Sequence, residues 1–502
     1  MEGASLRKQR EEYLDDLRRS ERTNSIINKR IQPSTTEKLS ATSNDEYRHL
    51  IGTKDEQEVR KVILETNLIN HTQVDLKQIC LGIMANDILQ NHRALILLKK
   101  KLLDENASIQ DIIDFNIIPY LLNHLNNSNY PQLNLEACWC IANICAGSRS
   151  SIESLVSKGL FEILPKILAS PHEKIFEQGA WAVGNISVED FRFKEMLLNY
   201  NLVEPLTLKI MKTDNQEVLT YTIWALNNLI SGSQKESQTI ITKRRYALPA
   251  LIKILKSQDD YELLGGTLSS LLDIMEESTV TYLIRENMVK RLLELSKIKQ
   301  KSIAFPALQI ITFITHGEEN QTQHFIDCNG IGVLFDIISS PSVDVACLRE
   351  CLWAISNITA GSLDQMKYVF SRNEWTGALF NYAVHSNEKV KREGYWAICN
   401  STKQLDTGHI NMLIDKGLLT LISNNLDTSL DEDLLVTSIE TLSCILKCGV
   451  SMDPRGVNKY QAHLETAGIV DKIEQLQLHP NRKVYESNSS FIETYFEVHD
   501  PI

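Results

Sequence analysis

The chain has 502 residues, of which 43% are hydrophobic and 23% charged, a composition typical of a folded, soluble protein. Its net charge of −12 is uneven, because residues 1–30 carry eight Lys or Arg against six Asp or Glu, which leaves −14 on the rest. An acidic body argues against nucleic-acid binding and favours a cationic ligand, and no apolar run approaches the roughly 20 residues that cross a bilayer, so we expect no membrane insertion.

The N-terminal residues are predicted to form a segment separate from the body. Residues 7–30 are rich in charge, and residues 31–48 are rich in Ser, Thr, Asn and Pro, which is typical of a linker. The charged N-terminus does not have the pattern of a secretory signal. We therefore expect a basic, partly disordered or helical segment over residues 1–45 and a folded body over residues 46–502.

Trp-x-x-x-Asn pairs recur through the body at a period of about 43 residues. The five pairs are Trp139/Asn143, Trp181/Asn185, Trp224/Asn228, Trp353/Asn357 and Trp396/Asn400. The gap of 129 residues between Trp224 and Trp353 is three periods, so two repeats lie inside it without a Trp. A period of this length is typical of stacked helical units of the HEAT or armadillo kind, which bury their apolar faces against one another.

This period predicts an all-α solenoid of about ten repeats. Their centres are expected near residues 96, 139, 181, 224, 267, 310, 353, 396, 439 and 482, with the last repeat over about 455–497. A β-propeller has a similar period, but the alternating strands and paired turns that it needs are absent from the sequence. Apolar helix starts follow Gly159, Gly330, Gly417 and Gly468, and these glycines predict sharp turns between the second and third helices of a unit.

Each Trp-x-x-x-Asn pair places two side chains one turn apart on the same face of a helix. An Asn side chain can bond both the C=O and the N–H of an extended peptide backbone. Neighbouring indoles can form slots for the stems and charges of Lys or Arg, and Glu189 and Glu393 are candidate acids at the slot ends. One such pair is more often a core aromatic beside a helix-capping Asn, but five in phase favour the binding of an extended basic peptide.

The sequence predicts no catalytic, cofactor-binding or metal-ligating residues. It contains no P-loop, Gly-rich dinucleotide turn, nucleophile elbow or paired Cys and His spacing, so we expect neither an enzyme nor a cofactor. The ten cysteines are expected to be small core residues. Surface positions are expected for His316, His324, His385 and His409.

Three segments around these pairs resemble the armadillo repeats of importin-α, the adaptor family that carries nuclear localisation signals. They are residues 137–148, 178–186 and 352–361. The family's importin-β-binding segment is similar in order and spacing to Leu17-Arg18-Arg19, Arg22 and Lys29-Arg30. The resemblance covers nearly the whole chain, and it implies a right-handed superhelical armadillo solenoid.

The resemblance also implies three sets of binding residues. A major groove for the localisation signal would contain Trp139, Asn143, Gly147, Ser148, Trp181, Asn185, Glu189, Trp224 and Asn228. A minor groove would contain Trp353, Asn357, Glu393, Trp396 and Asn400. The importin-β-binding segment would use Arg18, Arg19, Arg22, Lys29 and Arg30.

The partners that the resemblance implies are cargo proteins with localisation signals, importin-β, and a recycling exportin with Ran-GTP at the last repeat, with shuttling between cytoplasm and nucleus. The repeat near residue 267 lacks the family's Trp, and Gln309 and Phe313 replace an Arg and an Asn, departures that bear on the minor groove only. The alternative is an armadillo scaffold of the catenin type, which binds acidic partners through a basic groove. The acidic body favours the import adaptor.

Overall fold

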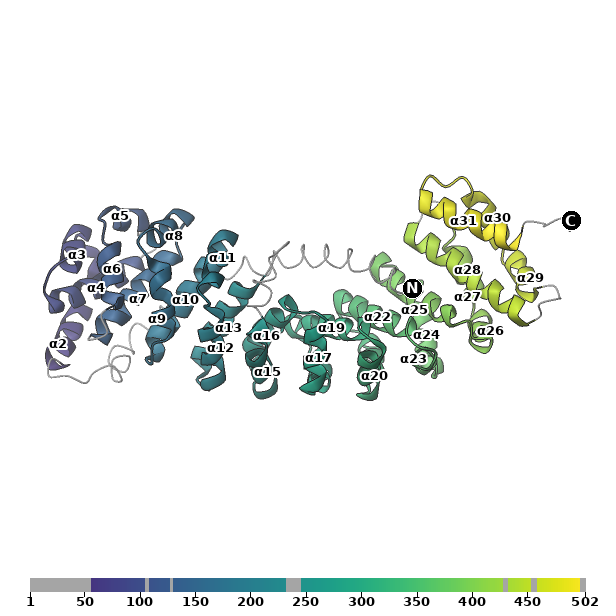
Figure 1. Ribbon diagram of the computed structural model, residues 1–502, viewed down its shortest axis with the longest axis horizontal. Helices are drawn as coiled ribbons and strands as arrows, with labels where there is room; N and C mark the ends of the chain where they lie inside the picture. Colours follow the sequence, from purple (N-terminus) through teal and green to yellow (C-terminus); the bar gives the residue numbers. More distant parts are fainter. Residues whose placement is uncertain are drawn as a thin grey trace. The chain divides into compact units, whose positions relative to one another are not determined.

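The computed structural model describes residues 56–103, 108–126, 130–231, 245–427, 432–452 and 458–496. Helices make up the regular structure of these ranges, which contain no strand, so the predicted all-α armadillo fold is confirmed (Figure 1). The segment predicted over residues 1–45 lies outside the described residues. So do all five residues assigned to importin-β binding, namely Arg18, Arg19, Arg22, Lys29 and Arg30.

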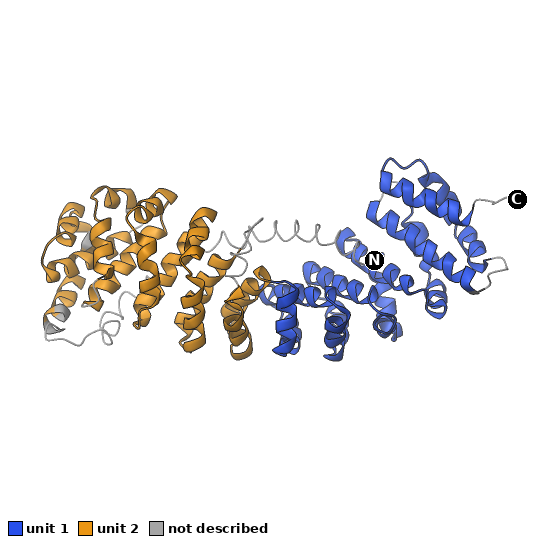
Figure 2. Ribbon diagram, viewed as in Figure 1, with its two compact units in different colours: residues 1–7, 275–502 blue, residues 8–274 orange. Residues whose placement is uncertain are grey.

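The described residues fall into two compact units, which we call the N-terminal unit (56–274) and the C-terminal unit (275–496) (Figure 2). Helices of the N-terminal unit are α2 (Glu56–Asn67), α3 (Leu76–Ile83), α4 (Ile88–Leu102), α5 (Ile109–Asp114), α6 (Ile118–Asn126), α7 (Pro131–Cys145), α8 (Arg149–Val156), α9 (Leu160–Leu168), α10 (Glu173–Glu189), α11 (Phe191–Asn199), α12 (Val203–Lys212), α13 (Gln216–Ile230), α15 (Leu248–Ser257) and α16 (Tyr261–Asp273). A short 3-10 turn, η2, covers His71–Gln73.

Helices of the C-terminal unit are α17 (Glu277–Arg285), α18 (Met288–Ser296), α19 (Lys301–His316), α20 (Glu319–Asp327), α21 (Gly330–Ile338), α22 (Val345–Thr359), α23 (Leu363–Val369), α24 (Asn373–Tyr382), α25 (Glu388–Ser401), α26 (Thr407–Asp415), α27 (Leu418–Asn424), α28 (Glu432–Met452), α29 (Lys459–Thr466), α30 (Ile469–Leu476) and α31 (Arg482–Tyr495). The 3-10 turn η3 (Thr402–Gln404) follows α25.

The long third helices of successive repeats pack side by side within each unit. In the N-terminal unit this row consists of α4, α7, α10, α13 and α16, and in the C-terminal unit it consists of α19, α22, α25, α28 and α31. Every predicted repeat centre falls on one of these helices, the last on the first residue of α31. The period in the sequence is therefore the spacing of third helices, because each one buries its apolar face against the next.

The sharp turns of the repeats lie between the first and second helices, so the predicted position between the second and third was wrong. Gly159 joins α8 to α9 with a φ of 96°, and Gly417 and Gly468 take the same left-handed conformation in their repeats. At the fourth site the left-handed residue is Asn329, with a φ of 62°, and Gly330 begins α21. Asn is one of the few side chains that tolerate this conformation, so it replaces Gly there.

Helix α28 corrects the expectation that no segment is apolar enough to cross a membrane. Its residues Glu432–Ser451 have a mean hydropathy of 1.4 and the length of a span. However, 61% of the most apolar window is buried, and α28 packs against α25 and α31. Burial on this scale is typical of the core helix of a solenoid, and it gives only weak support for a membrane span.

Candidate functional site: the Trp/Asn array

All five Trp-x-x-x-Asn pairs lie on third helices, three on α7, α10 and α13 of the N-terminal unit and two on α22 and α25 of the C-terminal unit. We call these ten side chains the Trp/Asn array. Its asparagines are all buried, with exposed fractions between 3% for Asn143 and 8% for Asn357. Trp139 and Trp353 are also buried, while Trp181, Trp224 and Trp396 are half-buried. The array is therefore part core and part surface.

The asparagine amides tie neighbouring third helices together. Asn185 donates from Nδ2 to the carbonyl of Ala142 at 3.4 Å, and Asn400 donates in the same way to Ser356 at 3.2 Å. Each accepting carbonyl belongs to the residue just before the Asn of the preceding repeat. Asn143 instead donates to the carbonyl of Trp139, one turn back on its own helix, at 2.9 Å. The array asparagines therefore also stabilise the packing of the third helices, a structural role that the binding hypothesis did not include.

The asparagine oxygens face a different environment. Among the described residues, no donor bonds Oδ1 of Asn185 or Asn400, and neither oxygen is a buried atom without a partner. These two acceptors therefore reach the surface. Asn228 differs, because its Nδ2 is buried and has no hydrogen-bond partner in the described part of the chain. An unsatisfied buried donor is uncommon in native proteins and is consistent with a ligand that supplies an acceptor.

The indoles are not evenly spaced. The rings of Trp139 and Trp181 contact edge to face, with centroids 6.2 Å apart and an interplanar angle of 83°. That contact leaves no room for a ligand side chain between them in this conformation. Trp224 instead packs on Gly184 of the preceding third helix, where a Cβ atom would overlap the indole ring. The predicted row of equivalent slots between indoles is thus not present in this conformation. Trp139 and Trp181 contact each other directly, and Trp224 packs on Gly184.

Buried glutamates near the array are paired with basic residues of the same chain. Glu136 on α7 is 3.4 Å from Lys99 of α4, whose ammonium also lies 5.2 Å from the Trp139 ring centroid. Glu177 on α10 is 2.9 Å from Lys174. In the C-terminal unit, Arg349 lies 3.8 Å from the adjacent residue Glu350. Sequence reasoning missed these acids, although each lies three or four residues before a Trp of the array.

The two acids that the sequence singled out lie in different settings. Glu189 is the half-buried last residue of α10, and Glu393 on α25 is only 4% exposed. Gly147 and Ser148 lie between α7 and α8, with Ser148 exposed at the start of α8. The residues predicted to line the major groove thus lie on the neighbouring helices α7, α10 and α13 and in the α7–α8 connection.

The C-terminal part of the array has less exposed aromatic surface. Trp353 is 5% exposed, and its Nε1 has no hydrogen-bond partner among the described residues. Trp396 donates from Nε1 to Thr437 at 3.2 Å, and the guanidinium of Arg392 lies 5.6 Å from its ring centroid. A basic side chain of the protein therefore already lies over this indole.

The repeats without a Trp fill the corresponding position with smaller buried side chains. Thr267 on α16 and Ile310 on α19 are fully buried. Thr267 donates to the carbonyl of Leu263 at 2.7 Å, one turn back on its own helix. Gln309 and Phe313 are half-buried. The array is thus interrupted at these two helices.

The described residues contain no group of three or more His, Cys, Asp or Glu that could hold a metal ion. Eight of the ten cysteines are buried and two, Cys328 and Cys444, are half-buried, and none forms a disulfide.

The prediction that His409 lies on the surface was wrong. Its side chain is buried, with 7% exposed, and its Nε2 lies 2.8 Å from Ser401 Oγ. Burial is the main reason why the pKa of His409 is lowered to about 4.

Comparisons with known proteins agree with this fold. A family model of the armadillo/beta-catenin-like repeat matches residues 106–146 and 318–360, and a model of an atypical Arm repeat matches residues 458–501. An engineered protein of known crystal structure is 20% identical, with a TM-score of 0.68 over 86% of this chain and 100% of its own. These matches identify armadillo-type repeats in three parts of the chain, in agreement with its all-α fold.

Curated relatives narrow this class further. Importin subunit alpha-5 of Arabidopsis thaliana is 26% identical over 97% of this chain and 89% of its own length. Importin subunit alpha-3 of the same plant is 26% identical over 98% of this chain and 89% of its own length. Importin subunit alpha-1b of Oryza sativa subsp. japonica is 26% identical over 78% and 73%, respectively. The chain is a divergent homologue of the importin subunit alpha proteins over nearly its full length.

Proposed function

We propose that this protein is a nuclear import adaptor that binds basic nuclear localisation signals along the Trp/Asn array and has no catalytic activity. The observation that carries the proposal is the array itself, five pairs on stacked third helices in a homologue of importin subunit alpha proteins. The net charge of −12 adds long-range attraction for a cationic peptide. The names of the relatives describe importin subunits and not enzymes.

The main signal-binding groove in this proposal is the row α7, α10 and α13, which has three of the five pairs. The surface oxygen of Asn185 would accept from a peptide N–H, and the buried Nδ2 of Asn228 would donate to a peptide carbonyl. Half-buried Trp181 and Trp224 would pack against the stems of ligand Lys or Arg side chains. The row α22 and α25 would be a second, weaker groove, because Trp353 is buried and Arg392 lies over Trp396.

The remaining partners in the proposal lie at the two ends of the chain. Arg18, Arg19, Arg22, Lys29 and Arg30, in the basic N-terminal segment, would bind importin-β. The last repeat, with α29, α30 and α31, would bind a recycling exportin together with Ran-GTP. The protein would then shuttle between cytoplasm and nucleus. Loss of importin-β capture on deletion of residues 1–45, with the repeat body still folded in thermal melting, is the expected result in a pull-down assay.

The groove is tested by fluorescence anisotropy of a labelled Lys/Arg-rich peptide titrated with the full chain. We expect micromolar or tighter binding that weakens as salt screens the charges. Trp181→Ala and Asn185→Ala are each expected to weaken binding by about 1–3 kcal/mol. Since Trp181 contacts Trp139 and Asn185 bonds Ala142, thermal melting of each variant must accompany the titration.

A control variant separates binding from packing. Trp375 on α24 is a buried indole outside the array that stacks on Phe335, with ring centroids 4.7 Å apart. Trp375→Ala is expected to lower the melting temperature and leave peptide affinity unchanged. If the folded wild-type chain does not bind the peptide, or if the array variants bind as tightly as wild type, the adaptor proposal is wrong and a scaffold of the catenin type becomes the better reading.

A further inference from the structure

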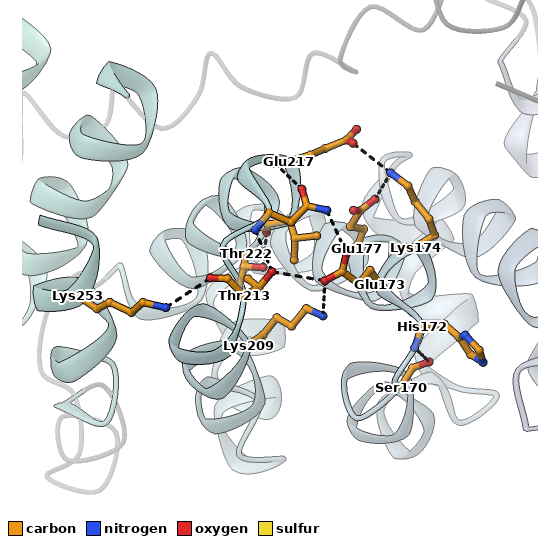
Figure 3. Close-up of polar contacts among 12 residues, drawn as sticks. Ser170, His172, Glu173, Lys174, Glu177, Lys209, Thr213, Glu217, Thr222 and Lys253 are labelled. Atoms are coloured by element: carbon orange, nitrogen blue, oxygen red, sulfur yellow. Dashed lines mark hydrogen bonds and ion pairs between the residues drawn. The ribbon is translucent and has the colours of Figure 1, made fainter. Parts of the chain in front are cut away.

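Lys174 of α10 lies between two carboxylates from neighbouring third helices (Figure 3). Its Nζ is 2.9 Å from Glu177 Oε2 on the same helix and 3.1 Å from Glu217 Oε2 on α13. Glu177 is 3% exposed, whereas the side chain of Glu217 is 41% exposed. The ammonium therefore connects a buried acid to an acid that faces solvent, so a cation from solution has a route to this site.

This cluster adjoins the proposed peptide groove. Lys174 and Glu177 lie seven and four residues before Trp181, which places all three on one face of α10. Tyr221 lies three residues before Trp224 on α13. Burial, followed by the nearby charges of Glu217 and Glu177, raises the pKa of Tyr221, so this side chain lies close to the same carboxylates. A peptide that packs on Trp181 and Trp224 would thus pass beside Lys174.

The electrostatic balance keeps Lys174 in place. Burial lowers the pKa of Lys174, but Glu177 and Glu217 outweigh it and raise this pKa to about 12. Glu177 has one carboxylate oxygen, Oε1, that is buried without a hydrogen-bond partner in the described part of the chain. A lysine is a point donor that meets one oxygen of this carboxylate, whereas a guanidinium can span both.

We propose that Lys174 occupies, from within the chain, a cation site that would otherwise bind a basic side chain of the peptide, and that it thereby limits affinity at this position. The inference rests on the proposed function. Lys99 of α4 also pairs with a buried acid of the array region, Glu136 on α7, and its ammonium lies over Trp139. A ligand cation can pair with Glu177 and Glu217 only if it displaces the ammonium of Lys174. The number of ion pairs then stays the same, so the ligand gains little affinity at this position.

The experiment is the peptide titration with the full-length Lys174→Met variant. Met keeps the aliphatic stem and removes the ammonium that pairs with Glu177 and Glu217, so we expect about three- to tenfold tighter binding and a steeper loss of affinity with salt. The matched control is Lys209→Met, which changes the net charge equally. Lys209 lies 3.3 Å from Glu173 and 5.1 Å from the Phe176 ring centroid, and it does not contact Glu177 or Glu217 in the bonds described (Figure 3). It is expected to bind as wild type does.

A second variant covers the case in which Lys174→Met leaves Glu177 unpaired and unfolds the chain. Lys174→Arg keeps the charge and can bond both oxygens of Glu177, so we expect a folded protein that binds the peptide about two- to fivefold more weakly. An equal gain from Lys174→Met and Lys209→Met would overturn the inference, because it would show only a general charge effect. Unchanged affinity in Lys174→Arg would also overturn it.

The outcomes separate this inference from the proposed function. If the wild type binds the peptide, Asn185→Ala weakens this binding and neither substitution at Lys174 changes it, then the inference about Lys174 is wrong and the proposed adaptor function stands. Absence of wild-type binding rejects both. Tighter binding in Lys174→Met only, with weaker binding in Lys174→Arg, supports both.

Discussion

Gly184 and Trp224 illustrate at the residue scale how closely neighbouring third helices approach. The indole of Trp224 on α13 fills the space where a side chain at Gly184 on α10 would lie. Asn185, the next residue along α10, instead bonds the carbonyl of Ala142 on α7. Gly184 thus determines the position of the Trp224 indole, and Asn185 links α10 to the third helix of the preceding repeat.

Gly184→Ala is therefore expected to destabilise the protein and to displace Trp224. The added methyl overlaps the ring, and such overpacking typically costs about 1–3 kcal/mol of the free energy of unfolding. Denaturant unfolding measures the cost, and the shift in tryptophan emission reports the displacement. Peptide affinity should fall in parallel.

The matched control is Gly377→Ala on α24, where a new Cβ atom meets nothing within 4 Å. Ala is a better helix former than Gly, so this control should be neutral or more stable by up to about 1 kcal/mol. Equal destabilisation of both variants would mean that backbone effects, and not the Trp224 contact, govern the Gly184 site.

At the scale of elements, α26 is attached to the preceding third helix, α25, through a buried histidine. His409 on α26 bonds Ser401 at the end of α25, and its ring lies 4.7 Å from that of Phe370. Asp406 caps α26 by accepting from the backbone N–H of His409 at 2.7 Å. A buried imidazole at such a junction makes the packing of these helices dependent on pH.

Acid is expected to destabilise this junction. The pKa of His409 is lowered to about 4, first by burial and then by the charge of Lys367, against 6.5 for an exposed His. As pH falls from 6.5 towards 4 the unfolded chain binds a proton that the folded chain does not, so the free energy of unfolding decreases over this interval, by up to about 3 kcal/mol.

Melting temperatures of wild type and His409→Gln between pH 7 and pH 4 provide the measurement. The variant should lose less stability over this interval, since it lacks the titrating group. Parallel curves for the two proteins would contradict the role given to His409.

At the scale of the whole molecule, the cysteines report on how completely the repeats are folded. All ten are free, and burial raises the pKa of every one of them, as for Cys138 and Cys145 on α7. A thiol reagent reacts with the thiolate, so both burial and the raised pKa slow the reaction in the folded state.

The expected result is that the folded chain reacts slowly at neutral pH, with Cys328 and Cys444 first because they are half-buried. Denaturant should release all ten thiols at comparable rates. Thiol counting by absorbance, with mass spectrometry of the labelled peptides, tests both statements. Rapid labelling of Cys138 or Cys145 in the native protein would show that α7 opens readily.

The sequence by itself determined the repeat architecture. A stacked repeat must bury one face of each third helix, so buried side chains recur at the spacing of those helices, and the predicted centres fall on α4 to α31. It also placed Trp and Asn on one face of five helices, since that depends only on the helical period. Assigning the turns failed because the first and second helices are both short, so the sequence pattern did not show that each glycine precedes the second helix and not the third.

Only the tertiary structure decided which parts of the array are buried and which reach the surface. Lys174 and Glu217 are 43 residues apart, as are Asn185 and Ala142, so their contacts depend on how helices pack and on which rotamers the packing allows. Net charge counts every acid equally, whereas a buried Glu paired with the chain's own Lys attracts a ligand far less. The sequence thus determined the helix face that carries the proposed peptide site, and packing between repeats decided which charges and indoles of that face remain exposed.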